Sequence, residues 1–195
     1  KGIALTPVKF GISFTATWYN QAGALLHLYT DGSIYLNHGG TEMGQGLHTK
    51  IMGIIAEEFD LPISKIKISA TDTSKVPNTS ATAASSGSDL NGMAVLNAIN
   101  ILKARLAGVL YESFGADKKS IQYKSGFVVF NSGKVSFETL IKMAYEQRVQ
   151  LSASGFYKTP KIYWDRSKGQ GRPFFYYSYG VMLCLLIFHH VVGVI

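Results

Sequence analysis

The sequence predicts an α/β (α+β) domain with a mixed sheet and helices packed on it. Two observations predict this class. Short segments rich in β-forming residues occur along the whole chain, and between them lie three stretches whose apolar residues repeat every three or four positions, as on one face of a helix. The 195 residues are 47% hydrophobic and 16% charged, so the chain can bury a sizeable core.

The first third of the chain predicts a β-hairpin followed by a helix. Residues 24–29 and 33–37 are rich in β-forming side chains and are separated by Thr30-Asp31-Gly32, a good turn sequence. Residues 46–59 predict a helix, which Asp60-Leu61-Pro62 ends. The apolar face of this helix comprises Leu47, Ile51, Ile54, Ile55 and Phe59.

The rest of the chain predicts two more helices and several strands. SKIKISATDT alternates like a strand, with Ile66 and Ile68 on one side. A long helix follows, with Ser88 or Asp89 as its candidate cap, and a third helix begins at Ser136 after a short strand and a hairpin with a glycine turn. We expect residues 149–158 to be extended and residues 163–175 to form a loop, which gives the order β-β-α-β-α-β-β-α-β in one domain. The buried stripe of the long helix comprises Val95, Ile99, Leu102, Leu106 and Val109.

Two loops of small residues each open a helix. The first is HGGTEMGQG, residues 38–46, and the second is the run of small and hydroxyl residues at 78–88. Free N–H groups and the positive end of a helix dipole favour an anion, glycine lets a ligand contact the backbone, and hydroxyls add donors for phosphate. Two such helix starts could bind one phosphorylated ligand between them. The alternative is that they are ordinary surface loops and helix caps.

The glycine loop matches neither of two common nucleotide-binding motifs. Gly46 is followed by Leu47-His48 and not by Lys and then Ser or Thr, so the loop is not a P-loop. Gly40, Gly44 and Gly46 also have the wrong spacing for a dinucleotide fingerprint.

The titratable residues around this loop predict a structural role. His38 and His48 flank it without a third ligand at useful spacing, so we expect hydrogen-bonded structural histidines and no metal site. We expect Glu42 to accept hydrogen bonds from nearby N–H groups, and the alternative is that it acts as a base or in an ion pair. No Ser/His/Asp arrangement follows from the spacing.

The charge balance is basic, with a formal net charge of +7. Such a balance suits nucleic acid, a membrane surface or an anionic small molecule, but no basic run is interleaved with aromatic residues, so nucleic acid is not expected. The single cysteine, Cys184, excludes an internal disulfide framework and a cysteine metal cluster, which fits a cytoplasmic protein. The start lacks an apolar h-region and a Met, so we expect no signal peptide and a chain that begins inside a longer protein.

At the two loops the sequence resembles a known family. FGISFTATWYNQAGALLHLYTDGSIYLNHGGTEMGQGLHTK and VPNTSATAASSGSDLNGMA are similar to the second molybdopterin-binding region of the xanthine dehydrogenase/aldehyde oxidase family. The form resembles the molybdopterin-binding large subunit of bacterial xanthine dehydrogenases. The resemblance runs from about Gly2 to Met182, and the Met-Gly-Gln-Gly and Thr-Ala-Ala-Ser elements at this separation are highly specific.

The resemblance implies part of the molybdopterin-binding domain of a molybdenum hydroxylase. In that family a molybdenum pyranopterin hydroxylates xanthine and hypoxanthine to urate, and electrons then pass through [2Fe-2S] clusters and FAD to NAD. The implied partners are the rest of the molybdenum subunit and an iron–sulfur/FAD subunit, so the clusters and FAD belong outside this chain. The implied cofactor-binding positions are Met43, Gly44, Gln45, Thr82, Ala83, Ala84, Ser85, Gly87 and Ser88.

The chain also departs from the family pattern. It has no Gly-Glu-Pro-Pro-type segment with the catalytic Glu, no Gly-Gly-x-Phe-Gly-Gly loop and no substrate-clamping Arg segment. We therefore assign no catalytic residue and expect no hydroxylase activity from the chain alone. Three alternatives stay open: a non-catalytic module that holds molybdopterin or pairs with other subunits, an aldehyde oxidase-type relative, and an unstable product without function.

The C-terminal end departs most clearly. We divide the chain into a molybdopterin-binding domain fragment, residues 1–182, and an apolar tail, residues 183–195, which reads LCLLIFHHVVGVI. A frameshift or gene-model error is the favoured explanation, a buried strand pair is the second and a membrane anchor the third. The apolar run is shorter than the ~20 residues that span a membrane, so we expect no membrane partner.

Overall fold

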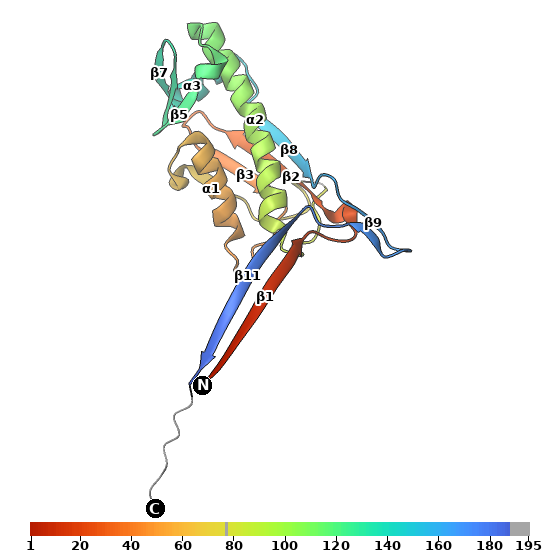
Figure 1. Cartoon of the computed structure of the whole chain (residues 1–195). Coiled ribbons are helices and arrows are strands. Elements are labelled where there is room, and N and C mark those ends of the chain that lie inside the picture. Colours follow the sequence, from red (N-terminus) through yellow and green to blue (C-terminus); the bar gives the residue numbers. More distant parts are fainter. Residues whose placement is uncertain (77, 188–195) are drawn as a thin grey trace, which may run out of the picture.

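The centre of the molecule is a four-stranded mixed sheet, seen in the computed structural model, which describes residues 1–76 and 78–187 (Figure 1). The strand order is β4-β3-β2-β8. The predicted hairpin forms its middle, β8 pairs antiparallel with β2, and β4 runs parallel to β3. This architecture confirms the predicted fold class. The strands are β2 (Gln21–Leu28), β3 (Ile34–His38), β4 (Ile66–Ile68) and β8 (Ser152–Lys158).

Two helices lie side by side against this sheet (Figure 1). The helix α1 (Leu47–Phe59) lies between Gly46 and Asp60, which both have left-handed backbone. Its predicted end is confirmed, and its start is one residue later than predicted, because Gly46 is the N-cap. The longer helix α2 (Gly87–Phe114) crosses β2 and β8 and buries all five residues of the predicted stripe. The core of the domain therefore lies between the sheet and these helices.

The start of α2 differs from the prediction. Its N-cap is Ser86, not Ser88 or Asp89, and no side chain caps it; the Ser86 hydroxyl donates to the Ala83 carbonyl at 3.0 Å instead. The reason is that Ala84 and Ser85 take positive φ and turn the chain into the helix earlier than the polar pattern indicates.

The third helix, α3 (Phe137–Glu146), starts as predicted. The Ser136 hydroxyl oxygen accepts a hydrogen bond from the Thr139 N–H at 3.0 Å, which satisfies one of the free donors of the first turn. A three-stranded antiparallel meander precedes this helix. Its strands are β5 (Gln122–Lys124), β6 (Phe127–Phe130) and β7 (Gly133–Ser136).

Among the described residues, one helix is long and apolar enough to cross a membrane, and it is α2. Half of its most apolar stretch is buried inside the domain. A central helix of a packed domain has the same composition, so α2 is accounted for by its contacts with the sheet and α1.

The prediction of a loop at residues 163–175 is wrong in part, because a small β-hairpin forms there. Its strands are β9 (Tyr163–Asp165) and β10 (Gln170–Arg172). The turn is local in origin: the Asp165 carboxylate accepts from the Ser167 N–H at 2.9 Å and from its hydroxyl at 2.7 Å, and Gly169 supplies a φ of +60°.

A long two-stranded ribbon extends from the domain (Figure 1). It pairs β1 (Gly2–Ile12) with β11 (Tyr176–Leu186) in antiparallel register and is exposed along almost its whole length. The strand β11 continues without interruption through the proposed boundary at residues 182/183. The described part of the tail is thus a strand, but an exposed one and not a buried strand pair; residues 188–195 lie outside the described residues.

Candidate functional site

The two small-residue loops lie together at the N-terminal ends of α1 and α2 and line one cavity of about 540 Å³. Thr82 joins the loops, because its hydroxyl oxygen accepts a hydrogen bond from the Thr41 N–H at 2.8 Å. Of the nine positions implied by the resemblance, seven line this cavity, and Gly44 and Ala84 lie between lining residues of the same loops. The seven are Met43, Gln45, Thr82, Ala83, Ser85, Gly87 and Ser88.

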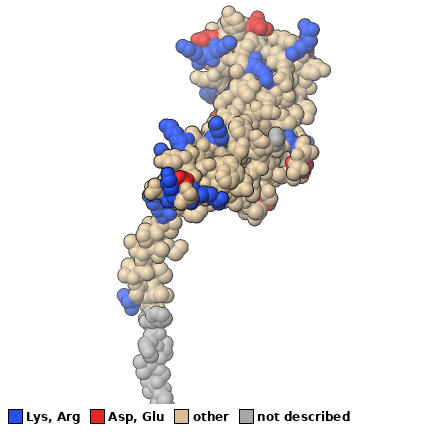
Figure 2. Space-filling model, turned by 90° about the vertical axis from the view of Figure 1, so that its right-hand side faces the viewer, with Lys and Arg blue, Asp and Glu red and all other residues tan. Residues whose placement is uncertain are grey.

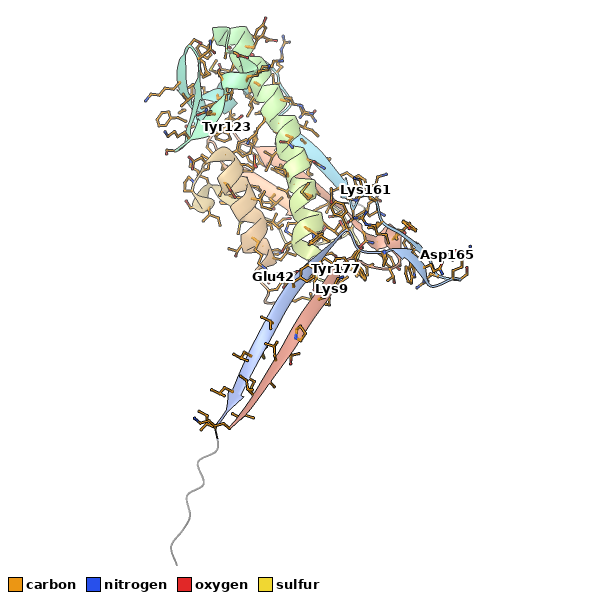
Figure 3. The ribbon with its side chains drawn as sticks, viewed as in Figure 1. Lys9, Glu42, Tyr123, Lys161, Asp165 and Tyr177 are labelled. Carbon is orange, nitrogen blue, oxygen red and sulfur yellow. The ribbon has the colours of Figure 1, made fainter. Side chains whose placement is uncertain are left out.

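Glu42 organises the first loop, beside the N-terminal end of α1 (Figure 3). Its carboxylate accepts backbone hydrogen bonds from Gly44 at 2.9 Å and from Gly46 and His48 at 3.0 Å. These bonds, that from His48 foremost, hold the pKa of Glu42 below its usual value. The predicted role as a structural acceptor is confirmed. Gly46 and His48 at the start of α1 therefore already donate to this carboxylate, whereas the N–H groups of Leu47 and Thr49 make no hydrogen bond within the described part of the chain.

The same loop leaves part of its backbone open. Gly44 and Gly46 have φ values of +96° and +73°, which L side chains rarely adopt, and no atom lies within 4 Å of the position that a Cβ would take at either residue. The Gln45 side chain bridges the loop, donating to the Thr41 carbonyl at 2.9 Å and accepting from the Met43 N–H at 2.6 Å. A ligand can therefore lie against a glycine backbone whose shape is already fixed.

The second loop has an unusual backbone. Ala84 and Ser85 both have φ near +55°, a conformation uncommon for residues other than glycine. They lead into α2, where the N–H groups of Gly87 and Ser88 make no hydrogen bond within the described part of the chain. The first turn of a helix leaves such donors free. Here they accompany the Ser85 and Ser88 residues at the cavity wall.

Two cavity residues were not predicted as site residues from the sequence, although Leu47 was expected on the apolar face of its helix. Leu47 and Lys50 lie three residues apart on α1 and line the wall together. Lys50 brings a positive charge to the cavity. The sequence could have indicated Lys50, because a lysine one turn after the start of a helix lies on the same side as the residue that begins the helix.

The two histidines flank the glycine loop, His38 at the end of β3 and His48 in α1, and their rings lie edge to face with centroids 5.2 Å apart. The Nδ1 atom of His38 accepts the Gly40 N–H at 3.0 Å, so His38 is the expected hydrogen-bonded structural histidine. Burial, and secondly the neighbouring His48, lower the pKa of His38 to about 4, which keeps its ring neutral at pH 7. No group of three metal-ligating side chains occurs among residues 1–76 and 78–187.

Asp89, in the first turn of α2, lies near Tyr157 and Tyr176, and the sequence did not predict this cluster. Burial raises the pKa of Asp89 above its usual value. Burial, followed by the charge of Asp89, raises the pKa of Tyr157 in β8 and of Tyr176 in β11. The two tyrosines come from strands far along the chain, so no local pattern indicates this cluster. It places the base of the ribbon beside the start of α2.

Comparison with known proteins is consistent with this arrangement of loops. Residues 1–190 match the model of the molybdopterin cofactor-binding domain family. The chain is 47% identical over 181 residues to a xanthine dehydrogenase/oxidase of Gallus gallus, covering 93% of this chain. It is also 47% identical over 194 residues to a xanthine dehydrogenase of Blastobotrys adeninivorans and 47% identical over 180 residues to aldehyde oxidase 2 of Macaca fascicularis. This chain spans about 12% of the length of each of these relatives.

Solved structures show the same fold. The reconstituted CO dehydrogenase of Oligotropha carboxidovorans superposes with a TM-score of 0.72 at 18% identity, over 94% of this chain and 23% of that one. The aldehyde oxidoreductase of Desulfovibrio gigas gives a TM-score of 0.70 at 18% identity, over 93% of this chain and 18% of that one. The family model and the fold agree: the chain belongs to the molybdopterin cofactor-binding domain family of xanthine dehydrogenase-type oxidoreductases.

Proposed function

We propose that the cavity between the two loops binds molybdopterin as part of a xanthine dehydrogenase-type molybdenum hydroxylase. One observation carries this proposal: loops 40 residues apart in the sequence, each opening a helix, meet around a single cavity of about 540 Å³. That volume lies within the range of small-molecule and cofactor sites.

The residues present fit the cofactor. The open backbone at Gly44 can accept a flat pterin without steric hindrance. The N–H groups of Gly87 and Ser88, the Ser85 hydroxyl and the Lys50 ammonium form a donor set for the phosphate. We therefore assign the phosphate to the start of α2 and not to α1, where the Glu42 carboxylate takes the His48 N–H and its negative charge would repel an anion.

The chemistry belongs to the bound group and to parts outside this chain. When bound, the molybdenum centre supplies oxidative hydroxylation of xanthine or hypoxanthine to urate. This chain's part is to hold the cofactor by the residues named above. We propose that the rest of the molybdenum subunit and an iron–sulfur/FAD subunit complete a cytoplasmic enzyme, and that the chain alone, without a catalytic Glu segment, is inactive. The division at residues 182/183 stays part of this proposal.

An aldehyde oxidase-type enzyme is the second candidate. The identity to the Macaca aldehyde oxidase equals that to the Gallus xanthine dehydrogenase/oxidase, so overall similarity does not separate the two. The turnover of xanthine and of an aromatic aldehyde by the enzyme assembled with its remaining subunit parts would decide between these substrate classes.

Retention of the cofactor tests the proposal directly. The full chain is expressed alone and together with the remaining parts of the subunit, and pterin released by acid is measured by its fluorescence. We expect the Gly44→Val/Ser85→Val double variant to retain roughly tenfold less pterin, since the valine at 44 fills the open space over the loop backbone and the valine at 85 removes a hydroxyl from the cavity wall.

Gly169→Val is the matched control. Gly169 also has positive φ and open space around it, but it lies in the β9–β10 turn away from the cavity. It should retain pterin like the unchanged chain. Equal pterin contents in the double variant and the unchanged chain would exclude the cavity as the binding site, and pterin only after complementation would mean that this chain forms one part of a shared site.

A further inference from the structure

A second, much smaller cavity lies behind the loop that opens α2. Its volume is about 10 Å³, close to what a single water molecule requires. Its wall is formed by β2, by residues 79–82 of the loop and by the first turn of α2. It is therefore directly connected to the backbone that we assign to the cofactor.

Two buried polar atoms belong to residues of this wall. The Oγ1 atom of Thr79 and the Oδ1 atom of Asn91 have no hydrogen-bond partner among the described residues. Asn91 is only 4% exposed. Its amide orientation is set, because Nδ2 donates to the Gly87 carbonyl at 2.8 Å, so Oδ1 is the atom left without a donor. Buried polar atoms in native proteins are almost always paired, often by an internal water.

A third group can complete the site. Thr82 lines the same cavity, and its oxygen already accepts the Thr41 N–H, so its hydroxyl hydrogen is available. A buried water typically makes about three hydrogen bonds, which matches one acceptor and two hydroxyls. We propose that this cavity binds one internal water, held by Asn91 and Thr79, and that these two residues thereby position the two cofactor loops against each other.

The side chains of Thr79 and Asn91 also pack closely against the backbone of the first loop. A Cβ at Gly39 would come within 2.4 Å of the Thr79 side chain, and a Cβ at Gly40 would come within 2.7 Å of the Asn91 Nδ2 atom. Both distances are shorter than real Cβ contacts, so any larger residue at Gly39 would collide with Thr79, and one at Gly40 would displace the end of the Asn91 side chain. Asn91 thus contacts the backbone of both loops, through Gly40 on one side and Gly87 on the other.

Oxygen-17 magnetic relaxation dispersion of water, which counts long-lived internal waters, tests the site on the full chain. We expect Asn91→Leu and Thr79→Val each to lose one such water, because both replacements keep the number and branching of the side-chain heavy atoms and remove a polar partner. Thr79→Ser keeps the hydroxyl and should keep the water. Asn97→Leu is the matched control on the same helix, since Asn97 donates to the Phe156 carbonyl outside this cavity.

Equal counts in the unchanged chain and in both apolar variants would overturn the proposal. If these variants do not fold, a high-resolution crystal structure of the unchanged chain decides. A water within hydrogen-bond distance of both Asn91 Oδ1 and Thr79 Oγ1 supports the proposal, and a cavity without density overturns it.

The role of Thr79 and Asn91 in positioning the loops rests on the proposed function, and it is tested separately by the rate at which pterin is released. In the complete subunit, we expect Thr79→Val to release pterin roughly tenfold faster than the unchanged protein and Thr79→Ser to restore the slow rate. Equal rates for the two variants would overturn the positioning role. A complete subunit that retains no pterin at all would overturn the proposed function, whereas the water count would still test the internal water by itself.

Discussion

The β2–β3 hairpin of the four-stranded sheet and the β1–β11 ribbon are both pairs of apolar, antiparallel strands, yet they differ completely in burial. In the sheet, Leu26 and Leu36 are 0% exposed. In the ribbon, Ile3 and Leu183 are 72% and 63% exposed. Figure 2 shows most of the ribbon uncharged, with Lys and Arg side chains gathered where it joins the domain. The difference teaches that strand composition does not decide burial; the presence of a covering layer does.

The covering layer of the sheet is specific in shape. The backbone of α2 approaches β8 so closely that a Cβ at Gly155 would lie 1.9 Å from the Ala94 carbonyl oxygen. The ribbon has no such layer among the described residues, and its one mid-strand glycine, Gly180, has only the Val8 Cβ nearby, at 4.0 Å. The same glycine-to-valine substitution can therefore be compared at a buried position, Gly155, and at an exposed one, Gly180.

The largest expected effect comes from Gly155→Val. The new side chain would overlap backbone atoms of α2, which cannot move without separating helix and sheet, so we expect a loss of about 3 kcal/mol or more, or failure to fold. Gly180→Val should be neutral or slightly stabilising, because valine suits an exposed strand better than glycine. Urea denaturation followed by circular dichroism measures both; similar losses in the two variants would contradict the comparison.

The second effect is a pH dependence that comes from His38, at the end of the buried strand β3. The pKa of His38 in the folded protein, about 4, lies below its unfolded value near 6.5, so the unfolded chain gains a proton first as the pH falls. His38 therefore costs little stability above pH 6.5 and lowers the free energy of unfolding progressively as the pH falls toward 4. From pH 6.5 to 5 we expect the unchanged protein to lose about 2 kcal/mol more than His38→Gln.

Urea midpoints measured across this pH range test the His38 prediction. His27→Gln, on the neighbouring strand β2, is the control and should keep the acid-dependent loss. Parallel curves for the unchanged protein and His38→Gln would show that His38 is not the group responsible.

The smallest effect on stability is expected on the ribbon. Leu183 and Leu185 pair with Leu5 and Ile3, so all four lie on one exposed face. Replacing both leucines of β11 by lysine should change the free energy of unfolding by less than about 0.5 kcal/mol each, since neither is buried. The same change should reduce self-association in sedimentation velocity, because it removes an exposed apolar strand face. A large loss of stability would mean that the ribbon packs on the domain.

The sequence predicted the helices better than the ribbon, for a physical reason. The periodic stripes of α1 and α2 and the turn at Asp60 are local signals, and the structure confirms them. The pairing of β1 with β11 joins the two ends of the chain, and no local pattern encodes such a partner. The start of α2 was misplaced because polar residues at 88 and 89 mimic caps, whereas the left-handed turn at Ala84 and Ser85 decides where the helix begins.

The sequence by itself determined the composition of the two loops, the helices that follow them and the membership of the family, because these depend on residue types at fixed spacing. Only the tertiary structure decided that both loops line one cavity, that Lys50 joins them, and that the Glu42 carboxylate takes the His48 N–H of α1 while the Gly87 and Ser88 N–H groups of α2 stay available. These facts depend on contacts between segments about 40 residues apart. Such contacts arise from the packing of helices on a shared sheet, which no short stretch of sequence contains.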